Sequence, residues 1–156
     1  MKPIQAHMEA AIAIALQAKQ NGDYAIGAVV VKDNKIIAEG INRVKTDQDP
    51  THHAEIVAIR QAAKLFGQRH LPECVLYTTH EPCPMCTGAI IFARMKGLVF
   101  GARIQDMKDF RLQSQNETWS WRTIDIPAKM IIEKSPYQLE LIEDFMREEC
   151  RKLFHI

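Results

Sequence analysis

Two short strings of the sequence hold three potential metal ligands, and each string has the pattern of a helix start. The strings are THHAE at residues 51–55 and EPCPMC at residues 81–86. Cys83 and Cys86 are three positions apart in a first helical turn, so both sulfur atoms can face one point. His53 can add one imidazole from the start of the other helix. A fold that uses all three ligands must bring two helix N-termini together.

The ligand set and a nearby carboxylate favour catalytic zinc. A helix N-terminus has a positive potential, which favours the thiolate form that zinc needs. One histidine and two cysteines give three protein ligands, the number typical of catalytic zinc, and leave a fourth position for water. Glu55 lies two positions after His53 and can border the metal without binding it. An unbound carboxylate can take and return a proton, and hydroxide with such a proton shuttle is what hydrolysis of an amino-substituted ring carbon needs.

Two other interpretations of these residues stay open. A structural zinc site needs a fourth protein ligand, for which His52, His80 or Cys74 is available. Such a chain would be a non-catalytic zinc-binding module, and Glu55 would have no role in it. The C-x-x-C pair at residues 83–86 follows an expected strand and opens a helix, as in a glutaredoxin-like redox site. However, that pair lies in the middle of the chain, behind a hairpin and the helix with His-x-Glu, which disfavours the redox interpretation.

Helical and strand patterns alternate along the chain, which predicts an α/β layer fold. Apolar residues recur at helical spacing in residues 4–16, 53–66 and 84–95. Short apolar runs predict strands at residues 25–31, 36–41, 74–78, 98–102 and 130–132. Residues 32–35 form the turn of a hairpin. A last helix is expected from Ser135, as N-cap with Pro136 at the first helical position, toward Leu153. Residues 103–127 are polar and have no clean period.

Length and composition indicate one globular domain over residues 1–156. The hydrophobic fraction of 47% is enough for a sizeable core, and the formal net charge of +1 does not indicate a strongly basic nucleic-acid binder. The longest apolar stretch, residues 10–16, is far too short to span a membrane. It has the pattern of an ordinary helix, so the chain is expected in the cytoplasm without membrane contact. Cys74 and Cys150 stand alone and are expected to be buried, small apolar residues.

At the two strings the sequence resembles a known family. The H-x-E string followed by P-C-x-x-C is the signature of zinc deaminases. Residues 25–102 resemble the cytidine deaminase superfamily, in the branch that holds guanine deaminase, cytosine deaminase and bacterial tRNA adenosine deaminase. The resemblance implies a three-layer α-β-α sandwich, in which a five-stranded mixed sheet has helices on both faces. It also implies Zn²⁺ as cofactor, with His53, Cys83 and Cys86 as ligands and Glu55 as the proton shuttle.

The same resemblance implies substrate-binding residues. Asn42 matches the family asparagine that hydrogen-bonds the substrate ring, and the backbone of Ala54 is expected to contact the ring too. Ile26 stands where guanine deaminases commonly have a stacking phenylalanine. Phe92 is expected in the core or in the pocket wall.

Two tryptophans follow the expected fourth strand. Trp119 and Trp121 either close over the substrate base by stacking or pack against the last helix. His52 replaces a residue that is usually small in this family, and it is expected to be a partly exposed residue at the helix start. The family is usually dimeric, which implies a homodimer in which a neighbouring chain helps to close the pocket.

The resemblance implies a nucleobase or nucleoside as substrate, with guanine as the leading candidate. Guanine deaminase is indicated by Pro84-Met85 within the cysteine pair, by residues 89–96 and by residues 135–137. The aspartate pair that guanine deaminases use in the C-terminal segment is absent, and residues 116–118 are the nearest polar group. A cytosine-type deaminase is an alternative, because residues 86–91 also resemble the fungal enzyme.

A tRNA adenosine deaminase is the second candidate. Those enzymes carry a glycine-rich, lysine-bearing stretch after the fourth strand, whereas residues 103–110 here contain no glycine. They also tend to end in a basic helix, whereas residues 137–156 here have a net charge of −2, which would repel a phosphate backbone. Residues 94–111 have a net charge of +3, so some basic surface exists. Transfer RNA is therefore a less favoured partner than a small molecule.

Overall fold

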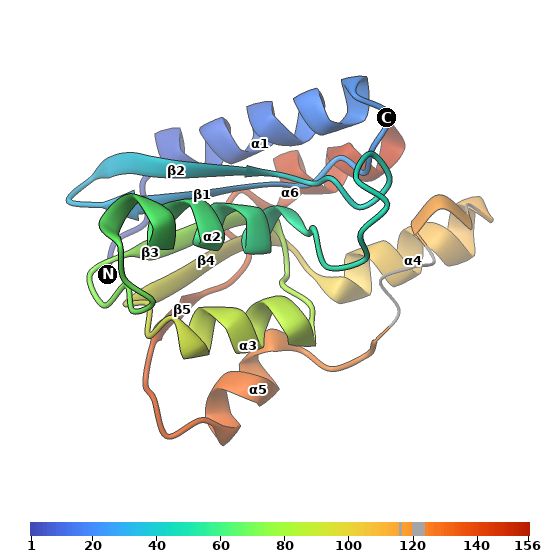
Figure 1. Cartoon of the computed structure of the whole chain (residues 1–156). Coiled ribbons are helices and arrows are strands. Elements are labelled where there is room, and N and C mark those ends of the chain that lie inside the picture. The colour runs from blue at the N-terminus through green and yellow to red at the C-terminus, as the bar shows by residue number, and fades with distance from the viewer. Residues whose placement is uncertain (116, 120–123) are drawn as a thin grey trace.

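Five strands form one mixed sheet in a computed structural model of the chain, which describes residues 1–115, 117–119 and 124–156 (Figure 1). The strands are β1 (Gly27–Lys32), β2 (Lys35–Ile41), β3 (Val75–His80), β4 (Gly97–Ala102) and β5 (Glu140–Ile142). Their order across the sheet is β2-β1-β3-β4-β5. β1 pairs antiparallel with β2 and β3, whereas β3 with β4 and β4 with β5 are parallel. Parallel neighbours need crossover connections, and these connections hold helices.

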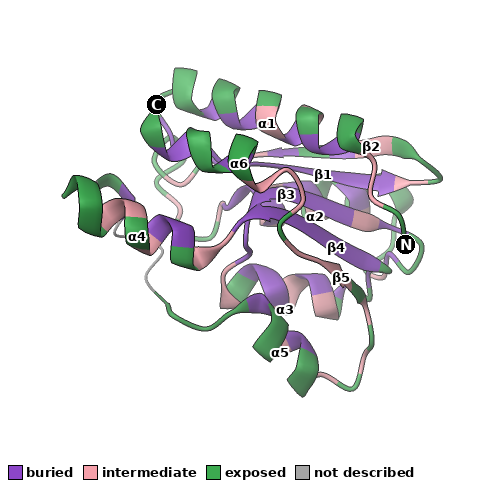
Figure 2. Cartoon of the chain, turned by 180° about the vertical axis from the view of Figure 1, so that it is seen from behind, coloured by how far each residue is buried: buried purple, intermediate pink, exposed green. Residues whose placement is uncertain are grey.

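Helices cover both faces of the sheet (Figures 1 and 2). α1 (Gln5–Gln20) and α6 (Arg147–Arg151) lie on one face, and α2 (Ala54–Phe66) and α3 (Pro84–Phe92) lie on the other. Figure 2 shows that buried residues line the strands and the sides of the helices that face them. The three-layer arrangement implied by the sequence is therefore confirmed.

Two glycines let the helices lie directly on the sheet. A Cβ atom at Gly27 would meet the Ala11 carbonyl oxygen of α1 at 2.2 Å, and one at Gly40 would meet the Ala54 carbonyl oxygen of α2 at 1.9 Å. Both obstacles are backbone atoms, which cannot move aside as a flexible side chain can. The start of α2, and with it His53, therefore rests against β2 at a place that depends on Gly40.

The expected fifth strand and the expected last helix are wrong. Residues 130–132 belong to α5 (Ala128–Lys134), whose N-cap is Pro127, and the fifth strand is β5, beside β4 at the sheet edge. A short apolar run does not distinguish a strand from a helix by its period. Ser135 does not begin a helix, because its hydroxyl oxygen accepts a hydrogen bond from the Tyr137 backbone N–H at 3.0 Å in a turn.

Residues 103–127, which have no clear period, contain a helix. α4 spans Ile104–Ser114, and a 3-10 turn, η1, spans Glu117–Trp119. The chain ends in α6 and a second 3-10 turn, η2 (Lys152–His155). Two short helical pieces thus replace the long last helix expected from the sequence.

The core lies between the sheet and its helices. Cys74 and Cys150 are 2% and 0% exposed, which confirms that they are buried residues. Within the described part of the chain, the structure contains no helix with the length and apolar character needed to cross a membrane.

Candidate metal centre

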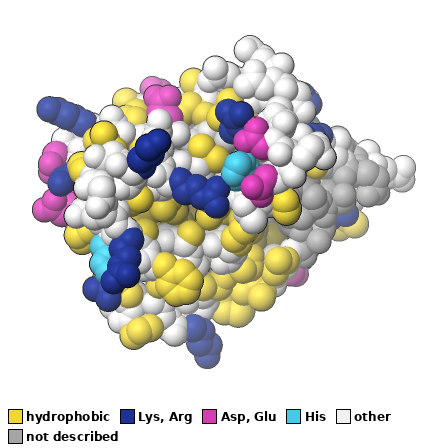
Figure 3. Space-filling model, viewed as in Figure 1, with side chains coloured by type: hydrophobic (Ala, Val, Ile, Leu, Met, Phe, Trp, Pro, Cys, Tyr) yellow, Lys and Arg dark blue, Asp and Glu magenta, His cyan; other side chains and the backbone are white. Residues whose placement is uncertain are grey.

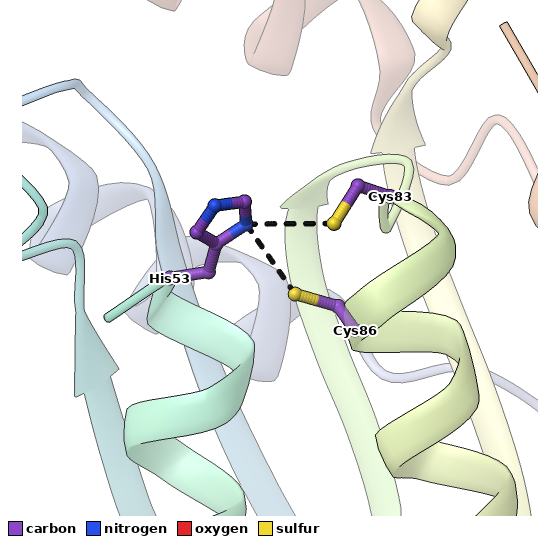
Figure 4. Close-up of side chains that lie close together, drawn as sticks. All are labelled: His53, Cys83 and Cys86. Carbon is purple, nitrogen blue, oxygen red and sulfur yellow. Dashed lines mark hydrogen bonds between the residues drawn. The ribbon is translucent and has the colours of Figure 1, made fainter. Parts of the chain in front are cut away.

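His53 and Cys83 occupy the same structural position at the starts of two helices. Each is an N-cap residue with an extended backbone, and α2 and α3 begin at the next residues, Ala54 and Pro84. Proline suits the first helical position because its φ is already helical and its missing N–H is not needed there. Neither N-cap side chain caps its own helix. In Figure 4 both side chains point into the space between the two helix starts.

The three expected ligands converge on one point (Figure 4). His53 Nδ1 lies 3.6 Å from Cys83 Sγ and 3.4 Å from Cys86 Sγ, and the three ligand atoms all lie within 4.8 Å of one another. In tetrahedral zinc sites, Zn–S bonds of about 2.3 Å and Zn–N bonds of about 2.0 Å place sulfur and nitrogen ligands about 3.5 Å apart. These donor atoms therefore fit a zinc ion.

The described residues place no fourth histidine, cysteine or carboxylate atom in this group. The candidates for a structural fourth ligand have other contacts. His52 Nδ1 and Nε2 lie 2.8 and 3.2 Å from carboxylate oxygens of Asp47 and Asp49. His80 Nδ1 bonds a neighbouring threonine hydroxyl at 2.8 Å, and Cys74 lies in the core. The three-ligand set typical of catalytic zinc is thus the one that the geometry favours.

Glu55 is the second residue of α2, and its side chain has a relative exposure of 0%. Its carboxylate does not belong to the group of ligand atoms around His53. Glu55 thus lies two positions after the expected ligand His53, in the first turn of the helix that His53 precedes. Its role as proton shuttle stays a prediction.

Asn42 follows β2 and is 1% exposed. Its backbone N–H donates to the Ile26 carbonyl at 3.3 Å, and its Oδ1 accepts from the Val44 N–H at 3.2 Å. Because Oδ1 is engaged, the amide leaves Nδ2 as its donor, and Nδ2 has no hydrogen-bond partner among the described residues. A buried donor without a partner costs about 1–3 kcal/mol, which a ligand with an acceptor would remove. Ile26 and Ala54 are fully buried, and their ring contacts stay predictions.

Trp119 is 4% exposed and lies in an aromatic cluster. Its ring stacks on His80, with centroids 5.3 Å apart and an interplanar angle of 20°, and it meets the Phe154 ring edge-on at 5.0 Å. Tyr24 is the third neighbour, at 5.7 Å. Contact with Phe154 of η2 is the packing alternative that the sequence leaves open, and base stacking by Trp119 stays a prediction. Trp121, like Asn116, lies outside the described residues.

Phe92 is not a core residue, because 81% of it is exposed. It is the last residue of α3, whereas Cys83 directly precedes the first residue of that helix. At 1.5 Å per residue, Phe92 lies roughly 13 Å further along the helix than Cys83. The structure therefore does not bring Phe92 to the metal ligands of its own chain.

Asp23 organises the loop that leads from Asn42 to His53, a role that the sequence did not predict. It is 3% exposed, and its Oδ2 accepts hydrogen bonds from the backbone N–H groups of Lys45 and Thr46 at 3.0 and 2.9 Å. The only sequence signal for this contact is an acidic residue between a helix-ending glycine and an apolar strand.

Asp47 holds the same loop next to the metal ligand. Hydrogen bonds from Arg43 and then from His52 lower the pKa of Asp47 to about 2. His52 directly precedes His53, so this hydrogen-bonded cluster of Arg43, Asp47 and His52 restrains the backbone from which the imidazole ligand extends. His52 is half-buried, which agrees with a partly exposed residue at the helix start.

Comparison with known proteins gives one family and two activities. Residues 1–102 match the family described as the cytidine and deoxycytidylate deaminase zinc-binding region. The chain is 48% identical over 103 residues to a guanine deaminase of Bacillus subtilis strain 168, and this alignment covers 66% of the chain but only 64% of that enzyme. It is 37% identical over 146 residues to a tRNA-specific adenosine deaminase of Buchnera aphidicola subsp. Schizaphis graminum, which covers 94% of the chain and 87% of that enzyme.

A solved structure extends the likeness over nearly the whole chain. It is described as "Biochemical and Structural Studies of A-to-I Editing by tRNA:A34 Deaminases at the Wobble Position of Transfer RNA". It superposes with a TM-score of 0.78 at 30% sequence identity, and the match covers 96% of this chain and 99% of that one.

Proposed function

This chain belongs to the cytidine and deoxycytidylate deaminase family, and from that premise we propose that it removes the exocyclic amino group of a small nucleobase or nucleoside, with guanine as the leading candidate. The products are the ring carbonyl compound and ammonia. The observation that carries this proposal is the convergence of His53, Cys83 and Cys86 at the start of the helix that holds the buried Glu55.

Glu55 is the proton carrier of the proposed reaction. His53, Cys83 and Cys86 would hold a zinc ion, which would supply Lewis-acid activation of water. Glu55 would take one proton from a water molecule as the water oxygen bonds to the amino-bearing ring carbon, and it would return this proton to the adjacent ring nitrogen. It then carries the second proton to the amino group, and the C–N bond breaks to leave a carbonyl and ammonia.

Asn42 is the proposed ring-orienting residue. Its Nδ2 is a buried donor without a partner among the described residues, and its Oδ1 is held by the Val44 N–H. Guanine, cytosine and adenine all have ring or carbonyl acceptors, so this donor supports a nucleobase substrate without choosing among the three. We expect Asn42→Ala to raise KM for the preferred substrate by about 10-fold or more, since a bound ring would lose a buried hydrogen bond.

Guanine is the first substrate of this proposal because the relative with 48% identity is a guanine deaminase. Adenosine in tRNA is the second candidate, supported by the alignment with the tRNA-specific enzyme over 94% of the chain. The net charge of −2 over residues 137–156 weighs against a polyanion at that end of the chain. A cytosine-type ring is a further alternative, from the sequence around the cysteine pair.

Ammonia release by the zinc-loaded protein tests the proposal. The panel contains guanine, cytosine, isocytosine, adenine, their nucleosides and a tRNA anticodon stem-loop. Turnover of a free base or nucleoside supports a small-molecule deaminase, and guanine is expected to react fastest. Turnover of the stem-loop alone would replace this substrate class by tRNA. No release from any member, with zinc bound, would refute the proposed activity.

We further propose a homodimer that uses the outer surfaces of α3 and α5. Phe92 and Met85 of α3 are 81% and 37% exposed, and Met130 of α5 is 51% exposed. Figure 3 shows hydrophobic side chains gathered on the face over these two helices. A helix with apolar residues on both its inner and outer sides is typically buried on both sides. This face is therefore the one that a second copy would cover.

A cytoplasmic location is part of the same proposal. Cys83 and Cys86 are useful as metal ligands only while they stay reduced. A reducing compartment keeps thiols in this state.

A further inference from the structure

We infer that Glu81 is a positioning residue. It fixes the position of α4, Trp119 and α5 relative to the loop that carries Cys83. We call α4, Trp119 and α5 the C-terminal wall. Glu81 lies between the end of β3 and Cys83, and it is 6% exposed. Together with Cys83 it lines a small cavity whose other side includes Ile104 and Met107 of α4. The α4 part of the C-terminal wall therefore borders the same cavity as the metal ligand Cys83.

One carboxylate holds the starts of both helices of the wall. Oε2 of Glu81 accepts a hydrogen bond from the Ile104 N–H at 2.9 Å, and Oε1 accepts one from the Ala128 N–H at 2.9 Å. Ile104 is the first residue of α4 and Ala128 the first of α5, so both bonds go to N–H groups that have no partner within their own helices. The two oxygens of Glu81 thus fix the position of both helices.

The backbone of Glu81 is fixed at the same time. Its N–H donates to the Ala102 carbonyl at the end of β4 at 2.7 Å. One residue later, the Pro82 carbonyl accepts a hydrogen bond from the Thr87 hydroxyl at 3.2 Å. Because the backbone of the loop is held at both points, a shift of the C-terminal wall would strain the contacts of Glu81, which lies two positions before Cys83.

The residue before Glu81 contacts the middle of the wall. His80 stacks on Trp119 at 5.3 Å, and Trp119 is 4% exposed. Two consecutive residues therefore hold the C-terminal wall at three places, the start of α4, Trp119 and the start of α5. We expect the position of the C-terminal wall to determine how tightly the substrate ring is enclosed rather than how fast the ring reacts.

The two oxygens of the Glu81 carboxylate make both helix contacts. A carboxylate accepts on two oxygens, and its hydrogen bonds to N–H groups are strengthened by its charge. A glutamine has one acceptor oxygen, and its NH₂ group would face the second N–H. Glu81→Gln therefore keeps the side-chain shape but removes one of the two anchors.

Quenching of Trp119 fluorescence tests this inference without substrate. In a Trp121→Phe background Trp119 is the only tryptophan. We expect Glu81→Gln to raise the acrylamide quenching constant of Trp119 by about 3-fold or more, because a buried ring becomes accessible when local contacts open. The matched control is Glu133→Gln, an exposed glutamate on α5, which should leave quenching unchanged. An unchanged quenching constant in a folded Glu81→Gln protein would overturn the inference.

A kinetic measurement extends the test and rests on the proposed deaminase function. We expect Glu81→Gln to raise KM by about 10-fold while kcat changes by less than about 3-fold and the zinc content stays unchanged. A loss of thermal stability with KM unchanged would show a merely structural role. If the wild-type protein deaminates nothing on the panel, the proposed function fails, whereas the quenching result still decides the role of Glu81.

Hydrogen exchange of the wild-type protein covers the case in which Glu81→Gln does not fold. The Ala128 amide is anchored by Glu81, whereas the next amide of α5, Lys129, has no bond to Glu81. We expect the Ala128 amide to exchange about 10-fold or more slowly than the Lys129 amide. Equal exchange rates would contradict the anchor.

Discussion

His53 and Cys83 are equivalent N-cap residues of two different helices, and their ligand atoms lie 3.6 Å apart. This relationship brings the positive ends of α2 and α3 to the same point. Positive potential favours thiolate over thiol at Cys83 and Cys86, and thiolate is the form that binds zinc. The fold therefore prepares the electrostatics of the metal centre through its backbone as well as through the ligands.

The first prediction concerns Glu55. Glu55→Gln keeps the volume of this fully buried side chain but removes its ability to carry protons. We expect zinc binding to be retained and kcat to fall by about 10²–10⁴-fold, the usual contribution of a positioned acid–base group. Zinc analysis and steady-state kinetics measure the two effects. Glu39→Gln, an exposed change on β2, is the control, and near-normal turnover of Glu55→Gln would exclude the shuttle role.

The local parts of this fold are the parts that the sequence predicts well. The hairpin of β1 and β2, the starts of α2 and α3 and the three metal ligands all depend on residues close together in the chain. Cys83 and Cys86 share one helical turn, and His53 needs only a second helix start nearby. The spacing of these residues along a helix fixes their relative positions, so the ligand set can be predicted from the spacing.

Features that depend on distant partners escaped the sequence analysis. β5 is a strand because it pairs with β4 at the sheet edge, whereas the more apolar residues 130–132 become helical where they pack on α3. Phe92 is exposed although it is strongly hydrophobic. This exposure was not predicted, because the sequence of a mostly apolar helix does not show which of its sides faces the sheet. The partners of Glu81 lie 23 and 47 positions away, so no local pattern indicates them.

The second prediction concerns cysteine reactivity. Zinc should protect Cys83 and Cys86 from iodoacetamide at pH 8, and a chelator should make both reactive, since the released thiolates lie at a helix start. Cys74 and Cys150 should stay unmodified in both states. Burial raises the pKa of the Cys74 thiol, and burial raises that of Cys150 to about 12, so both thiols remain protonated at this pH. Mass spectrometry of the alkylated peptides gives the answer. Equal reactivity of Cys83 with and without chelator would contradict the metal centre.

The third prediction concerns the contact between the start of α2 and Gly40 of β2. Gly40→Ala places a Cβ atom 1.9 Å from the Ala54 carbonyl oxygen, so the start of the helix must move away from β2. We expect a loss of about 1–3 kcal/mol in the free energy of unfolding, as for overpacked cores, together with weaker zinc binding through His53. Urea denaturation and chelator competition measure these two quantities. Glu39→Ala, an exposed neighbour on the same strand, should change stability by less than about 0.5 kcal/mol. Normal zinc affinity in Gly40→Ala would show that the contact between α2 and β2 does not determine the position of the His53 ligand.

The fourth prediction concerns acid stability. Burial acts to raise the pKa of Asp106, but hydrogen bonds from Arg147 and from the Arg103 backbone outweigh it and hold the pKa below its ordinary value. The stability from this contact is therefore present above about pH 4, the unfolded-state pKa, and is lost as pH falls through the lower folded-state pKa. We expect Asp106→Asn to cost about 1–3 kcal/mol at pH 7 and to flatten the acid limb of the stability curve.

Urea denaturation between pH 2 and pH 7 tests this linkage. Asp109→Asn, an exposed change on the same helix, should leave the pH profile unchanged. If Asp106→Asn loses stability by the same amount at every pH, the ionised carboxylate is not the source of the effect.

The last prediction concerns Phe92. Since 81% of this residue is exposed, Phe92→Asp should change the stability of a single chain by less than about 0.5 kcal/mol. In a dimer formed through α3 and α5, however, the same change would bury a carboxylate among apolar side chains, which is unfavourable unless the charge is paired. We therefore expect sedimentation equilibrium to show a dimer for the wild-type protein and a monomer for Phe92→Asp. Leu112→Asp on α4, where the native side chain is 80% exposed, is the matched control and should remain dimeric. A wild-type monomer would remove the dimer from the proposal, and dissociation by Leu112→Asp alone would move the interface from α3 to α4.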